Sequence, residues 1–154
     1  MKKTFADYVA ALPGLKKQLC ASKPLTADQI ANLRSAGVYC FSEGDIYLYV
    51  GRTRNFRERH QGHCHETSGE NKAVFAFRIA RIATGKLKAS YKKEGSRKHL
   101  MKNPEFLHAF LAAKQRIKGM DVRFVEVSDP IQQHLLELYA SMELGSEHNS
   151  FETT

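Results

Sequence analysis

The sequence predicts an α+β fold in one domain, with a small, mainly antiparallel sheet of three to four strands flanked by helices. The chain has 154 residues, which suits one domain, and its 42% hydrophobic content can fill one core. Apolar residues recur at helical spacing in some segments and alternate in others. No apolar run approaches the length of a membrane span. We therefore expect a soluble, cytoplasmic protein without a membrane partner.

The first third of the chain favours two helices followed by a β-hairpin. Residues 5–19 carry apolar side chains at helical spacing, and Pro13 is expected to break or kink this helix. A second helix is expected to begin at Thr26-Ala-Asp-Gln29, which has the form of a capping box. The runs 38–41 and 46–50 are rich in β-formers and are separated by turn residues, which predicts a hairpin.

The hairpin register can be predicted from its side chains. If Tyr39 lies opposite Tyr49, the aromatic side chains gather on one face of the sheet and the aliphatic ones on the other. This register needs an odd-length loop or a bulge at residues 42–46. The aromatic set is Tyr39, Phe41, Tyr47 and Tyr49, and the aliphatic set is Val38, Cys40, Leu48 and Val50. We expect the functional site on the tyrosine face.

The remaining elements alternate between helix and strand. A short helix is expected at 56–63 with Asn55 as its N-cap, and alternation predicts a strand at 74–80. Asn103-Pro104 and Asp129-Pro130 each combine a cap with a proline at the first helical position, which predicts helices to about residues 118 and 144. A further strand is expected at 122–127.

The charge of the chain favours an anionic partner. Its 24 Lys and Arg residues against 16 Asp and Glu residues give a net charge of +8, and nucleic acid is the natural candidate. The segment from Arg78 to Lys102 contains many basic residues and only one acidic residue, Glu94. A solvated basic face is the plainer alternative. The predicted nucleic-acid-binding residues are Arg52, Arg54, Lys86, Lys88, Lys92, Lys93, Arg97 and Lys98.

Two triplets on the hairpin carry a resemblance to a known family. Gly37-Val38-Tyr39 and, after nine intervening residues, Tyr49-Val50-Gly51 resemble the paired motifs of the GIY-YIG endonucleases. The family's arginine, which follows the second motif's glycine by eight residues, is matched by Arg59. The remaining family positions are matched by His63 one turn later, Glu137 on a later helix and Asn149 near the end.

The resemblance implies one nuclease domain over residues 1–154. A helical extension would occupy 1–36 and the catalytic module 37–151, with a basic insertion at about 81–102. It implies hydrolysis of DNA phosphodiester bonds to give 5′-phosphate and 3′-hydroxyl ends, with RNA as an alternative substrate. Cutting both strands would need two such sites, which makes a homodimer one expected assembly.

The resemblance also implies roles for several of these residues. Glu137 would be the ligand of Mg²⁺ or Mn²⁺, since magnesium needs only one or two carboxylates when phosphate and water complete its shell. The Arg59 guanidinium would donate two hydrogen bonds to the scissile phosphate, and His63 would lie on the same helical face. Tyr39 is assigned as the base and Tyr49 as a positioner, and the reverse assignment stays open. A free phenol has a pKa of about 10, so nearby cations must lower it.

Two alternatives come from other functional classes. One is a nucleic-acid-binding module whose chemistry has lapsed, and the other is a protein-interaction domain in which the lysines only confer solubility. A zinc site in the run His60-Gln-Gly-His63-Cys64-His65 is disfavoured, because consecutive residues on a helix point in different directions.

Overall fold

The computed structural model describes residues 2–86 and 96–151. The chain divides into two compact units. The first comprises residues up to Glu58 together with Asp121–Asn149, and the second comprises Arg59–Met120 with the residues after Asn149. The expectation of one domain over the whole chain stays a prediction. Of the predicted nucleic-acid-binding residues, Lys88, Lys92 and Lys93 lie outside the described residues.

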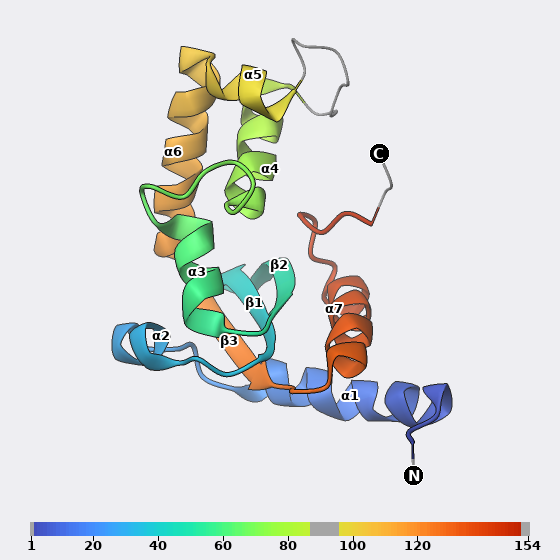
Figure 1. Ribbon diagram of the computed structural model, residues 1–154. Helices are drawn as coiled ribbons and strands as arrows, with labels where there is room; N and C mark the ends of the chain where they lie inside the picture. The colour runs from blue at the N-terminus through green and yellow to red at the C-terminus, as the bar shows by residue number, and fades with distance from the viewer. Residues whose placement is uncertain (1, 87–95, 152–154) are drawn as a thin grey trace. The chain divides into compact units, whose positions relative to one another are not determined.

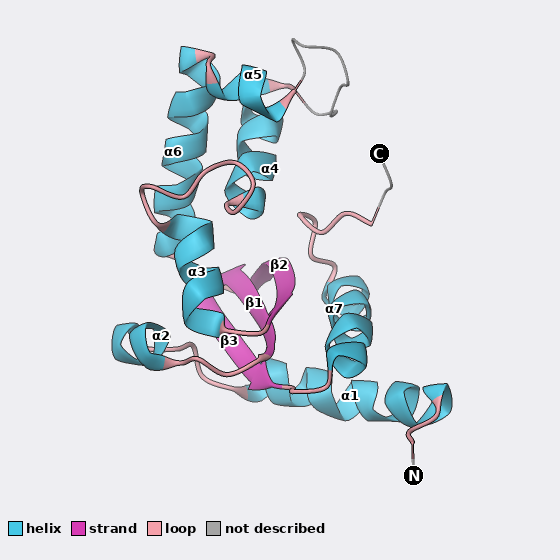
Figure 2. Ribbon diagram, in the orientation of Figure 1, coloured by secondary structure: helices cyan, strands magenta, loops and turns pink. Residues whose placement is uncertain are grey.

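The first unit contains a three-stranded antiparallel sheet of β1 (Gly37–Glu43), β2 (Ile46–Thr53) and β3 (Asp121–Glu126), in the order β2-β1-β3 (Figures 1 and 2). This confirms the α+β class and the antiparallel sheet. Because β1 is central, β2 and β3 are the edge strands of the described sheet.

The strand expected at 74–80 is wrong, because this segment forms helix α4 (Val74–Thr84) of the second unit (Figure 2). Phe75 and Ile79 are four residues apart, as are Ala76 and Ala80, and all four are buried. The run therefore satisfies the helical period as well as the alternating one. Packing of a helix buried on much of its circumference decided between the two periods.

The register of the hairpin differs from the expected one by two residues. Tyr39 lies opposite Gly51 rather than Tyr49, and Phe41 lies opposite Tyr49. A bulge at Phe41–Ser42 then shifts the pairing. Tyr39 and Tyr49 still share a face, but the bulge places Tyr47 opposite Ser42 and packs it against the aliphatic core.

The aliphatic face of the sheet is covered by α1 (Phe5–Ala21) and α7 (Pro130–Leu144). The expected break at Pro13 is wrong, since α1 runs through it. Proline has no N–H, so the Val9 carbonyl four residues earlier loses its usual hydrogen bond within the helix. Val9 is 41% exposed, so water is close to that turn of the helix. The core consists of Leu12, Leu19, Val38, Cys40, Val50, Val125, Val127, Leu136 and Ala140.

The predicted helix caps of the first unit are confirmed. The Thr26 hydroxyl accepts from the Gln29 N–H and the Gln29 side chain accepts from the Thr26 N–H, which starts α2 (Ala27–Asn32). Asp129 accepts from two backbone N–H groups at the start of α7, and Gly145 ends that helix at a φ of 62°.

The second unit is helical. Helix α3 (Phe56–Cys64) begins in the first unit and continues into the second, which also contains α4, α5 (Arg97–Met101) and α6 (Pro104–Lys118) (Figure 1). The Asn103 side chain caps α6 as predicted. Phe77 packs against Phe106 and Phe110, with ring centroids 5.0 and 6.2 Å apart.

A buried lysine organises the loop after α3. The Lys114 ammonium on α6 donates to the carbonyls of His65, Glu66 and Ser68 at 3.0, 2.8 and 2.9 Å. It also lies 5.0 Å from the centre of the Phe110 ring. The side chain is only 3% exposed, so these carbonyls replace the water that the ammonium loses on burial.

Candidate active site

Gly51, the glycine of the second triplet, leaves room for the Tyr39 side chain to extend over β2. Gly51 faces Tyr39 across β1 and β2, and a Cβ added to Gly51 would lie 2.2 Å from the Tyr39 hydroxyl oxygen. The phenol therefore rests on bare backbone, with its hydroxyl over β2. Gly37 has the same kind of constraint, because its Cβ would lie 2.1 Å from the Val125 carbonyl oxygen. Both glycines of the two triplets are thus required by close packing.

The two tyrosines lie together on one face of the sheet, as predicted. Their ring centroids are 6.4 Å apart. Tyr39 also packs edge-on against Phe41 at 5.7 Å and Phe56 at 5.8 Å. Tyr39 is 1% exposed whereas Tyr49 is half-buried. The sequence left open which tyrosine is the base. Tyr49 is therefore the more accessible of the two phenols for that role.

The candidate carboxylate approaches β2 from the opposite side. Arg52 lies opposite Val38 in the sheet, so its side chain leaves β2 on the aliphatic face that α7 covers. Its Nε is 3.9 Å from a carboxylate oxygen of Glu137 on α7. The expectation that the whole site lies on the tyrosine face is therefore wrong, because side chains of neighbouring strand residues alternate between faces.

Asn149 pairs with the outer edge of β2 as a strand would. Its carboxamide oxygen accepts from the Val50 N–H at 2.8 Å, and its amide nitrogen donates to the Val50 carbonyl at 2.7 Å. The Ser146 hydroxyl donates to the same carboxamide oxygen at 2.6 Å, and the His148 N–H donates to the Leu48 carbonyl at 3.2 Å. Sequence reasoning missed this edge contact, because nothing in the local pattern around Asn149 indicates a partner 99 residues away.

The donor set around β2 fits one kind of metal site. Magnesium prefers hard oxygen ligands and accepts one or two carboxylates when phosphate oxygens and water supply the rest. Glu137 provides such a carboxylate, and its side chain is 23% exposed. Within residues 2–86 and 96–151, no three His, Cys, Asp or Glu side chains are placed to hold an ion together. Glu137 could hold such an ion only together with phosphate oxygens and water.

Arg59 and His63 belong to the second unit, on α3. The Arg59 guanidinium donates to the Lys72 carbonyl at 3.1 Å, which fixes it against the loop before α4. His63 is fully buried with its ring edge-on to Phe75, at 6.3 Å between centroids. Burial, together with the charges of Arg59 and His60, lowers the pKa of His63 well below its ordinary value. His63 is therefore neutral at neutral pH.

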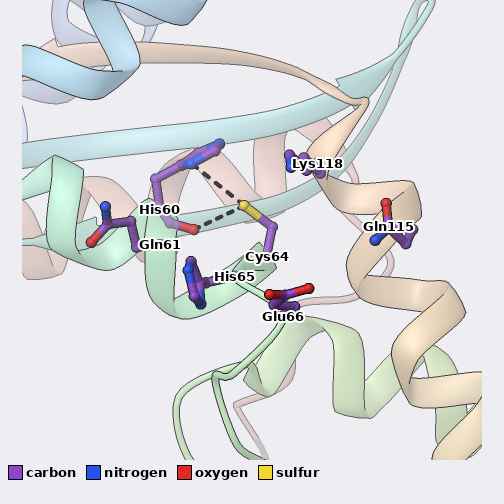
Figure 3. Close-up of a pocket in the computed structure, with 7 residues that line it drawn as sticks. All are labelled: His60, Gln61, Cys64, His65, Glu66, Gln115 and Lys118. Carbon is purple, nitrogen blue, oxygen red and sulfur yellow. Dashed lines mark hydrogen bonds between the residues drawn. The ribbon is translucent and has the colours of Figure 1, made fainter.

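A polar hollow of about 390 Å³ lies elsewhere in the second unit, between α3 and α6 (Figure 3). The Cys64 thiol contacts His60 Nδ1 at 3.5 Å and donates to the His60 carbonyl at 3.2 Å. Burial raises the pKa of Cys64, so the thiol is not activated as a nucleophile. The hollow is lined by His60, Gln61, Cys64, His65, Glu66, Gln115 and Lys118.

The remaining described basic candidates are on the surface. Arg54, Lys86 and Lys98 are exposed, as expected for phosphate contacts. Arg97 is also exposed, donates to the Glu70 carbonyl at 3.1 Å and lies over the ring of Phe77.

Comparison with known proteins yields no relative. No family model matches the chain, and no curated protein or solved structure shows significant similarity to it. In the part of the chain that the structure describes, no helix combines the length and apolar character needed to cross a membrane.

Proposed function

We propose that this protein is a divalent-metal-dependent endonuclease that hydrolyses DNA phosphodiester bonds and leaves 5′-phosphate and 3′-hydroxyl ends. One observation carries the proposal: candidates from separate parts of the chain contact residues 49–52 of β2, with the phenols on one face of the sheet and the Glu137 carboxylate on the other. The Tyr39 hydroxyl lies over Gly51, Glu137 contacts Arg52, and Asn149 bonds to Val50. Tyr49 begins the same segment.

The chemistry of this edge suits attack of water on a phosphate. A tyrosine at the edge can accept the proton of the attacking water. Arg52 balances the Glu137 carboxylate before substrate binds. A bound Mg²⁺ or Mn²⁺ would offset the charge that develops on the phosphate and on the departing 3′ oxygen.

The substrate class is supported by charge. The net charge of +8 and the exposed side chains of Arg52, Arg54 and Lys86 suit a polyanion. Each contact with a phosphate releases counterions, so binding to a DNA duplex should weaken steeply as salt is added. RNA offers the same phosphates and is the natural comparison substrate.

The test is the conversion of supercoiled plasmid to nicked or linear form in Mg²⁺ or Mn²⁺. We expect Glu137→Gln, Tyr39→Phe and Arg59→Ala each to reduce cleavage by about 100-fold or more while duplex binding persists. Glu143→Gln is the matched control, because Glu143 is exposed on the same helix. The ends of the product should be ligated without prior phosphorylation.

Other outcomes would identify the rival functions. Salt-dependent binding without cleavage by any pure preparation would indicate a nucleic-acid-binding module whose chemistry has lapsed. No salt-dependent affinity for DNA or RNA would indicate a protein-interaction domain. Cleavage that survives Glu137→Gln unchanged would overturn the assignment of the site.

A further inference from the structure

Two arginines of the second unit share one aromatic ring. The guanidinium carbon of Arg81 on α4 is 4.9 Å from the centre of the Phe77 ring, and that of Arg97 on α5 is 5.0 Å from the same centre. Phe77 is itself held in the core by Phe106 and Phe110. Both guanidinium groups therefore lie about 5 Å from the centre of one buried ring, and their charges act on each other.

Each guanidinium is oriented by one backbone carbonyl. Arg81 donates from Nη1 to the Lys86 carbonyl at 3.1 Å, and Arg97 donates from Nη1 to the Glu70 carbonyl at 3.1 Å. Arginine has five N–H donors in a planar fork, so most donors of both side chains are not used by these bonds. Neither arginine forms an ion pair with a carboxylate of residues 2–86 or 96–151.

The pair has an electrostatic cost that an anion would remove. Arg81 is 8% exposed, and its burial together with the charge of Arg97 lowers its pKa from the ordinary value. Backbone carbonyls orient the two forks but carry no full negative charge. A phosphate group that contacts both guanidinium groups would supply that charge, and its oxygens would accept their hydrogen bonds.

We propose that Arg81 and Arg97, stacked on Phe77, form a phosphate clamp that holds the sugar-phosphate backbone of the DNA substrate. The clamp rests on the proposed nuclease function, since it names residues that hold the substrate of that reaction. Arg97 was predicted from its charge alone, whereas Arg81 becomes a candidate only through its position beside Arg97 and Phe77.

The clamp is tested by the salt dependence of duplex binding. Because Arg81 is buried, its loss could impair folding, so the principal variant is the exposed Arg97→Gln. We expect this variant to lower the slope of log affinity against log salt by about one, equivalent to one lost phosphate contact. Lys102→Gln, which removes an equal exposed charge just after α5, should change the slope by less than half as much. Arg81→Lys should also lower duplex affinity if it folds, because lysine lacks the planar fork.

A second measurement separates a backbone clamp from a site for free anions. Inorganic phosphate is titrated into the protein while the Nε resonances of its arginines are followed, with chloride as the reference salt. We expect duplex DNA to shift the two clamp resonances at micromolar concentration and phosphate to shift them only at millimolar concentration. Tight binding of phosphate with no effect of Arg97→Gln on DNA would overturn the clamp as a DNA contact.

Failure of the clamp and failure of the nuclease proposal can be told apart. If wild-type protein cleaves plasmid and Arg97→Gln has the same salt slope as wild type, only the clamp is wrong. If the wild type neither binds nor cleaves DNA, the proposed function is wrong.

Discussion

The two units of this protein place their charged groups in different ways. In the first unit, Arg52 and Glu137 face each other at an exposed strand edge, and the register of β2 decides which face each neighbour takes. In the second unit, Lys114 and Arg81 are buried and bond to backbone carbonyls. Strand register thus places charged side chains at a surface, whereas the buried cations of the second unit fasten loops through backbone carbonyls.

The largest expected effect is the loss of the buried ammonium in the second unit. Lys114→Met removes the ammonium that donates to three carbonyls. We expect the free energy of unfolding to fall by about 3 kcal/mol, because these buried acceptors lose their partner. Urea denaturation measures this change. Lys118→Met, one turn later and exposed, should stay within about 0.5 kcal/mol of wild type. Equal effects of the two variants would show that the carbonyl contacts contribute little.

Adding a methyl group at Gly51, beneath the Tyr39 ring, should lower the free energy of unfolding somewhat less. Gly51→Ala forces Tyr39 away from β2, and we expect a loss of about 2 kcal/mol in unfolding free energy together with a changed near-ultraviolet dichroism of the tyrosines. Gly14→Ala is the control, because an added Cβ there meets no atom within 4 Å. Inside helix α1 that change should stabilise the protein by about 0.5 to 1 kcal/mol. An unchanged tyrosine signal in Gly51→Ala would contradict the packing described for Tyr39.

The buried histidine should make stability depend on pH. Burial and the charges of Arg59 and His60 lower the pKa of His63 in the folded protein. Below the ordinary histidine pKa of about 6.5, His63 therefore binds more protons in the unfolded chain than in the folded one. The stability present above pH 6.5 is therefore lost as the pH falls, by up to about 1.4 kcal/mol per pH unit for one group. Urea midpoints at pH 7.5 and 5.5 measure the loss, which His63→Gln should reduce. The remaining dependence would come partly from His60, whose pKa is also lowered by burial.

The smallest expected effect lies at the edge of β2. Asn149→Ala removes two hydrogen bonds to Val50 and should cost about 1 kcal/mol. Hydrogen exchange should show faster exchange of the Val50 amide, with the amides of α6 unchanged as an internal control. Asn149→Gln, one methylene longer, should restore little of the protection. A Val50 amide that exchanges at the wild-type rate would argue against the edge contact.

Local sequence signals predicted most of the elements. The capping box at Thr26, the cap-plus-proline pairs at Asn103 and Asp129, and the turn between β1 and β2 are all confirmed. Each depends on atoms within a few residues of one another. The segment 74–80 failed because its side chains fit two periods, and only packing chose between them.

The candidate site was predicted in part. The two tyrosines share a face as expected, but the register is shifted by two residues and Glu137 comes from the other side of the sheet. A bulge changes which residues are opposite without altering the local β pattern, so the sequence could not place it. The roles of the residues in catalysis stay predictions.

The sequence by itself determined the fold class, the positive charge and the residues available for chemistry, because these depend on composition and on short-range spacing. The tertiary structure alone decided that Tyr39 rests on Gly51, that Asn149 closes the edge of β2, and that Arg81 joins Arg97 on Phe77. These contacts join distant parts of the chain, and they form only when packing has fixed the strand register and the faces of the helices.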